Sequence, residues 1–130
     1  MSSKLFGILF ILIVLGVLIF AFAPGQWTPA WIVNHDKFSH MVVFFALSIF
    51  LSLAIPSLSL VQHSLFLLSF AILIELVQYL FVGRGFSIDD LIYDVLGVLG
   101  FYTVVFWAKN KHRFKQLTVS LIKSEEAKGH

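Results

Sequence analysis

The most informative segment of this chain is residues 75–100, with the sequence ELVQYLFVGRGFSIDDLIYDVLGVLG. It is largely apolar, yet several of its side chains carry a charge or an amide: Glu75, Gln78, Arg84, Asp89, Asp90 and Asp94. In a lipid bilayer such groups are energetically costly, and they are retained where they have a partner or a function. The segment therefore predicts a polar site inside a protein that is otherwise surrounded by lipid.

The composition of the whole chain indicates an integral membrane protein. Of its 130 residues, 59% are hydrophobic and 12% are charged, and the mean hydropathy is +0.96. A soluble domain of this length could not bury so much apolar surface. The chain has no cysteine, which excludes disulfides, thiolate catalysis and cysteine-ligated metal sites.

Four apolar segments are long enough to cross a bilayer as α-helices. We expect these spans at residues 5–23, 37–55, 61–82 and 88–108, separated by turn-forming Pro and Gly residues. The first segment could instead be a signal peptide, because Ala21-Phe22-Ala23 resembles a cleavage site. Its apolar core is longer than the h-region of most signal peptides, however, so we expect it to be retained as a helix. The predicted fold is an all-α bundle of four transmembrane helices.

The distribution of positive charge predicts the orientation of this bundle. Four spans place both chain ends on one side of the membrane, and seven of the nine Lys and Arg residues lie on that side, leaving Lys37 and Arg84 on the other. The positive-inside rule then predicts cytoplasmic termini. Residues 1–108 would form the transmembrane domain and residues 109–130 a basic cytoplasmic tail. Apolar residues recur at helical spacing in the tail, which suits an interfacial helix, although a frayed end that only fixes the topology fits equally well.

This topology brings polar residues from three spans to the outer leaflet. They open the second span, close the third and open the fourth, and the candidate ligand-binding set is Asp36, Lys37, His40, Glu75, Gln78, Arg84, Asp90 and Asp94. Spacings of three or four residues place Asp90 and Asp94 on one helix face, with Gly97 continuing that face. A small residue at that position would let a neighbouring helix approach closely. Ser87 is the expected N-cap of the fourth helix.

The order and spacing of these residues resemble those of the VanZ-like family. Asp36-Lys37-Phe38-Ser39-His40, followed by Phe44, is similar to the family's D-K-x-x-H-x-x-x-F motif. The family's E-x-x-Q, Gly-Arg, Phe-Ser and D-x-x-x-N-x-x-G-x-x-G motifs correspond to Glu75, Gln78, Gly83, Arg84, Phe86, Ser87, Asp90, Asp94, Gly97 and Gly100. One position departs from the pattern, because the family usually has Asn where this chain has Asp94.

The resemblance implies a small multi-pass protein of the bacterial cytoplasmic membrane. The family is named for a protein that confers low-level resistance to the glycopeptide teicoplanin, which links it to the cell envelope. The expected partners are membrane lipids, with a lipid-linked cell-wall intermediate as the more specific candidate and a homo-oligomer left open. No cofactor is expected, and no nucleic-acid-binding surface is predicted.

Three functions follow from these residues. In the first, Lys37 and Arg84 contact an anionic lipid headgroup, since an Arg fork matches phosphate oxygens. In the second, the protein is an enzyme acting on a lipid phosphate, with His40 and Glu75 as its acid–base pair. In the third, the protein is a scaffold in which the polar residues only hold the helices together.

A metal site is a weaker alternative. Glu75, His40, Asp90 and Asp94 offer carboxylate oxygens and one imidazole, which can bind a divalent cation. Their spacing is not diagnostic of any metal, so the sequence assigns no metal ligand. The histidines outside this region, at positions 63, 112 and 130, are expected to be ordinary polar residues.

Overall fold

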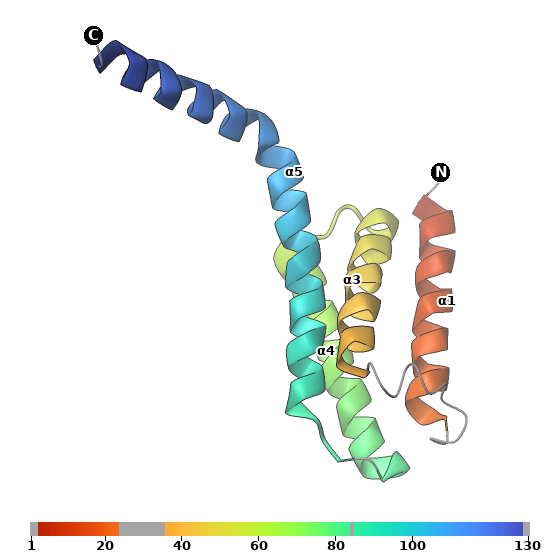
Figure 1. Ribbon diagram of the computed structural model, residues 1–130. Helices are drawn as coiled ribbons and strands as arrows, with labels where there is room; N and C mark the ends of the chain where they lie inside the picture. Colours follow the sequence, from red (N-terminus) through yellow and green to blue (C-terminus); the bar gives the residue numbers. More distant parts are fainter. Residues whose placement is uncertain (1–2, 24–35, 84, 129–130) are drawn as a thin grey trace.

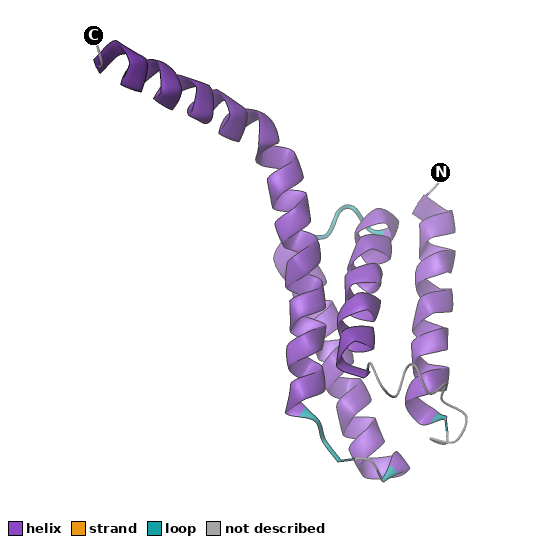
Figure 2. Ribbon diagram, in the orientation of Figure 1, coloured by secondary structure: helices purple, strands orange, loops and turns teal. Residues whose placement is uncertain are grey.

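The computed structural model describes residues 3–23, 36–83 and 85–128, and all regular secondary structure in these ranges is helical. The elements are α1 (Ser3–Phe22), α3 (Asp36–Ala54), α4 (Leu60–Val77), the π-helix η2 (Gln78–Val82) and α5 (Ile88–Lys128). They run alternately along the bundle, so that α1 begins at the end where the distal part of α5 leaves it (Figures 1 and 2). Four helices are long and apolar enough to cross a membrane: Ser3–Phe22, Asp36–Ala54, Leu60–Val82 and Ile88–Lys111. The predicted four-span, all-α fold is confirmed.

Helix boundaries follow the expected turn chemistry. α3 ends at Ala54, two residues before Pro56, which cannot continue the backbone hydrogen bonds of a helix. α4 begins after Ser59, whose hydroxyl accepts a hydrogen bond from the Gln62 N–H while the Gln62 side chain accepts one from the Ser59 N–H, forming a capping box. Ser87 caps α5, since its Oγ accepts a hydrogen bond from the Asp90 N–H at 3.2 Å. The N-cap predicted at Ser87 is confirmed.

The third span does not remain α-helical to its end. From Gln78 it continues as a π-helix, and the N–H of Gly83 donates to the carbonyl of Gln78, five residues back. Gly83 has φ 72°, a left-handed conformation that glycine adopts without a Cβ penalty and that ends the helix. A π-turn of this kind is uncommon and is often found near functional sites.

The fourth span also differs from expectation at its end. α5 continues past residue 108 as far as Lys128, because the segment that follows contains no Pro or Gly to stop it. The tail of residues 109–128 is therefore a direct continuation of α5, which bends away from the bundle there (Figure 1). Its position along a membrane surface stays a prediction.

α3 lies in the middle of the bundle and contacts α1, α4 and α5. The buried core is formed by apolar side chains from α3, α4 and α5, namely Phe44, Leu47, Leu51, Leu67, Ala71 and Val98. Many other large apolar side chains are exposed on the outside of the helices, which is the arrangement expected where the surroundings are acyl chains. In lipid, helices associate through close packing and interhelical hydrogen bonds rather than by excluding water.

A close helix contact lies between α3 and α5, at Gly97. A Cβ added to this glycine would overlap the carbonyl oxygen of Met41 and lie 3.0 Å from the backbone nitrogen of Phe45. Gly100, one turn further on, has more room, because an added Cβ would lie 3.5 Å from the Phe45 ring. The close approach predicted from the small residue at position 97 is therefore confirmed, and it is limited by backbone atoms that cannot rotate away.

We expect Gly97→Ala to destabilise the bundle, because the new methyl group forces α3 and α5 apart. Overpacking of this kind typically costs about 1–3 kcal/mol. Gly100→Ala is the matched control, since it gains the same helix propensity and meets only the Phe45 ring at 3.5 Å. Unfolding of both variants in detergent micelles measures the difference, and equal stabilities would contradict the close contact.

Candidate functional site

The end of the bundle opposite the N-terminus of α1 collects polar residues from three helices (Figure 1). They come from the start of α3, the end of α4 with η2, and the start of α5, and we refer to them as the polar cluster: Asp36, Lys37, His40, Glu75, Gln78, Asp89, Asp90 and Asp94. Arg84, the remaining candidate, lies outside the described residues. The three helix ends lie together in the structure, and a shared binding role for these residues stays a prediction.

His40 is the centre of the polar cluster. Its Nδ1 lies 3.0 Å from Oδ1 of Asp94, a hydrogen bond between α3 and α5. Its Nε2 faces two further carboxylates, with Oδ2 of Asp90 at 3.8 Å and Oδ1 of Asp36 at 3.9 Å. These last two distances are too long for hydrogen bonds. One imidazole thus lies among three carboxylates contributed by two helices.

Asp94 determines how this imidazole is held. It is 1% exposed, and when it is ionised it can only accept hydrogen bonds, so that the proton of the bond is then carried by Nδ1 of His40. Nε2 is the atom that faces Asp36 and Asp90. An Asn at position 94 could accept the same hydrogen bond through its carbonyl oxygen but would bring no charge.

Lys37 is paired with Asp89 at the rim of the cluster. Its Nζ lies 2.6 Å from Oδ2 of Asp89, and the two side chains are 51% and 62% exposed. The ammonium also lies 6.0 Å from the centre of the Tyr93 ring. Asp89 thus takes a partner at the rim, whereas Asp90 faces His40. A pair this exposed contributes little to stability and can exchange its partner.

Glu75 is buried beneath the rim, with 1% of its surface exposed. Its Oε2 accepts a hydrogen bond from the backbone N–H of Ser87 at 2.8 Å, which ties α4 to the start of α5. Its Oε1 has no hydrogen-bond partner among the described residues. Asp90, His40 and Asp94 lie within range of electrostatic interaction with it.

The pairing of His40 and Glu75 expected from the sequence is not a direct contact. His40 bonds to Asp94, and Glu75 bonds to the backbone of Ser87. Lys37 does not pair with Glu75 either, because its ammonium bonds to Asp89. Asp94 is the direct partner of His40, and this contact depends on how α3 is rotated relative to α5. The spacing of residues within one helix does not reveal that rotation, so the sequence could not predict the pairing.

Gln78 forms an interhelical tie. Its side-chain amide is buried and donates a hydrogen bond to the backbone carbonyl of Ala21 at 3.0 Å, near the end of α1. This bond satisfies a carbonyl that has no partner within its own helix. Gln78 therefore contacts α1, although it shares a helix segment with Glu75.

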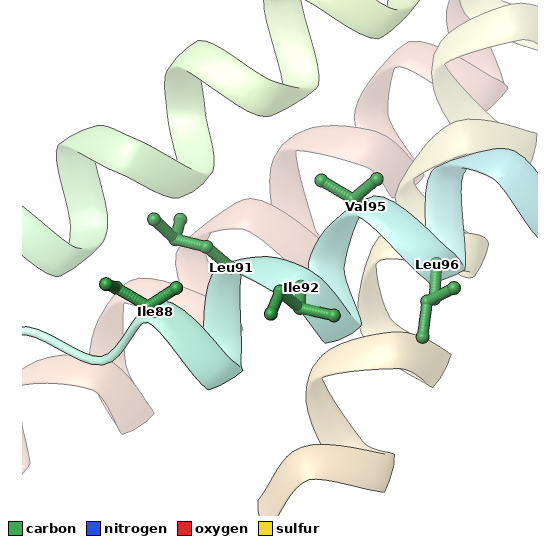
Figure 3. A pocket seen from close by; sticks show the side chains of 5 residues that line it. All are labelled: Ile88, Leu91, Ile92, Val95 and Leu96. Carbon is green, nitrogen blue, oxygen red and sulfur yellow. The ribbon is translucent and has the colours of Figure 1, made fainter.

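Two other features lie away from the polar cluster. An open hollow along the outside of α5 is lined by five aliphatic side chains, none of them in the cluster: Ile88, Leu91, Ile92, Val95 and Leu96 (Figure 3). His63, near the start of α4, was expected to be an ordinary polar residue. It is 3% exposed, and neither ring nitrogen has a hydrogen-bond partner among the described residues.

Comparison with known proteins identifies one family. Residues 5–110 match the family described as VanZ/LLP1. No curated protein and no solved structure matched the chain. The matched residues include nearly all of the four spans and every member of the polar cluster.

We expect Asp94→Ala to destabilise the protein more than Asp94→Asn. Alanine leaves Nδ1 of His40 without an acceptor in a buried position, which costs about 1–3 kcal/mol, whereas the Asn carbonyl can accept the bond. Asp89→Ala is the control at an exposed carboxylate of the same helix. Unfolding in detergent measures all three, and an Asp94→Ala variant as stable as Asp94→Asn would show that the bond to His40 contributes nothing.

Proposed function

Because this chain belongs to the VanZ/LLP1 family, we propose that it is a multi-pass protein of the bacterial cytoplasmic membrane that binds an anionic envelope lipid and contributes to teicoplanin resistance. The ligand would be a phosphate-bearing headgroup, with a lipid-linked cell-wall intermediate as the specific candidate. The polar cluster is the binding site in this proposal.

The arrangement of Lys37 carries the proposal. This ammonium is half-exposed at the rim of the cluster, and its bond to Asp89 is one that a lipid phosphate can replace. Arg84 follows the left-handed Gly83 in the sequence and adds a second cation of the type that binds phosphate bidentately. The partly buried His40 and the buried Asp94 lie behind this rim and fix the helix ends that present it.

In the proposed orientation the polar cluster faces away from the cytoplasm. Because the native chain has no cysteine, a single introduced Cys residue can report on which side of the membrane each loop lies. Both Gly85 and Ser57 are exposed, and they lie in loops at opposite ends of the bundle. We expect a membrane-impermeant maleimide to label Gly85→Cys in intact cells and Ser57→Cys only after the membrane is opened. The reverse pattern would place the cluster on the cytoplasmic side.

Lipid binding predicts a specific loss in Lys37→Ala. We expect the detergent-extracted protein to retain a phospholipid or lipid-linked intermediate in native mass spectrometry, and Lys37→Ala or Arg84→Ala to release it. Lys109→Ala removes a positive charge at the opposite end of the bundle and should retain the lipid.

In a susceptible host, Lys37→Ala should lower the teicoplanin concentration tolerated, while Lys109→Ala leaves it unchanged. If the two variants behave alike in both assays, the headgroup proposal is wrong.

The pair of His40 and Asp94 favours a second candidate, a membrane-embedded enzyme acting on a lipid phosphate. A histidine held by a carboxylate at 3.0 Å can accept and return a proton, and 23% of its side chain remains exposed. The expected signature is release of inorganic phosphate from a long-chain lipid diphosphate by the purified protein, abolished in His40→Gln while the helical content is retained. Lipid retention without turnover favours the binding function, and unfolding of the variants favours a scaffold.

A further inference from the structure

We propose that Asp36, His40 and Asp90 bind a divalent transition-metal ion, with Asp94 positioning His40 from behind. This site lies within the polar cluster but needs neither Lys37 nor Arg84, so it is independent of the headgroup proposal. The ligand atoms would be one carboxylate oxygen each from Asp36 and Asp90 and Nε2 of His40.

The distances among these three atoms suit a shared ion. All of them lie within 4.8 Å of one another, and Nε2 is 3.8 Å from Oδ2 of Asp90 and 3.9 Å from Oδ1 of Asp36. Ligand atoms about 2.1 Å from a tetrahedral Zn²⁺ lie roughly 3.4 Å apart. The observed separations are too long for hydrogen bonds and are close to the edge of such a ligand triangle. Small rotations of the Asp36 and Asp90 carboxylates would bring the three atoms to the separations of such a triangle.

The hydrogen bond from His40 to Asp94 supplies the orientation that a metal-binding histidine needs. In most metal sites the ring nitrogen that does not bind the metal donates to a carboxylate or carbonyl. Nδ1 of His40 lies 3.0 Å from Oδ1 of Asp94, so a neutral imidazole that donates to an ionised Asp94 has its Nε2 lone pair directed toward the two facing carboxylates. A lone pair held against two carboxylates is unfavourable unless a positive charge lies between them.

The charge balance of the cluster also favours a bound cation. Apart from Asp89, the cluster contains four carboxylates: Asp36, Glu75, Asp90 and Asp94. Among the residues described at this end of the bundle, Lys37 is the one Lys or Arg side chain, and it is bonded to Asp89. The buried Oε1 of Glu75 has no hydrogen-bond partner in the described part of the chain. A buried acceptor without a partner is uncommon in folded proteins, and a nearby cation or water would satisfy it.

The donor set indicates which ions to test. One imidazole nitrogen with two carboxylate oxygens suits borderline divalent ions such as Mn²⁺, Fe²⁺ or Zn²⁺ better than Ca²⁺. Three protein ligands leave at least one coordination position open. A doubly protonated His40 is the competing explanation of the same distances, since an imidazolium would also be attracted to three carboxylates.

The test uses the full-length protein in detergent, stripped with a chelator and titrated with Mn²⁺. Electron paramagnetic resonance measures the bound fraction, and electron spin echo modulation detects a coordinated imidazole nitrogen. We expect one Mn²⁺ per chain with a nitrogen signal, displaced by Zn²⁺. Asp90→Asn should weaken binding at least tenfold, whereas Asp89→Asn, the adjacent residue, should leave it unchanged.

Two further variants separate binding from folding. The side chain of Asp36 is 47% exposed, so the Asp36→Asn variant should fold normally. It should nevertheless bind Mn²⁺ more weakly than the native protein. Asp94→Asn should weaken binding by about 10–100-fold while the nitrogen signal persists, as is typical of a partner behind a metal ligand. Absence of stoichiometric Mn²⁺ and Zn²⁺ uptake, equal effects of Asp89→Asn and Asp90→Asn, or a bound ion without the nitrogen signal would each overturn the proposal.

Discussion

The hydrogen bond between His40 of α3 and Asp94 of α5 sets how the helices of this bundle meet. Apolar side chains pack almost equally well in many rotations when lipid surrounds them, so a buried polar pair is what selects one arrangement. The bond can form because Gly97 lets the α5 backbone approach that of α3 within one turn of Asp94. Asp36 and Asp90 come to face Nε2 of the same imidazole as a consequence.

The polar cluster is also placed where a membrane helix best tolerates carboxylates. Asp36 lies in the first turn of α3, and Asp89 and Asp90 lie in the first turn of α5. Unpaired N–H groups and the positive end of the helix dipole stabilise negative charge at these positions. Glu75 comes from the end of α4 and benefits from the same environment through the N–H of Ser87. Two helix N-termini side by side thus allow acidic groups to gather without an equal number of cations.

How much of this was predictable depends on whether a feature is local or interhelical. The spans, the Ser87 cap and the shared face of Asp90 and Asp94 follow from hydropathy, turn chemistry and helical spacing. The pairing of Lys37 with Asp89, and of His40 with Asp94, depends on the rotation of one helix against another, which no single segment encodes. The bond of Gln78 to Ala21 could not be predicted for the same reason, because it depends on how the third span packs against α1.

The π-turn of η2 gives this part of the chain a tolerance to changes in length that the regular part of the span lacks. A π-turn holds one residue more than an α-turn, so deleting one residue from Gln78–Val82 allows a return to α-helical hydrogen bonding. A deletion earlier in α4 would instead rotate the residues that follow by about 100° and shift them by about 1.5 Å, which would turn Glu75 away from the N–H of Ser87.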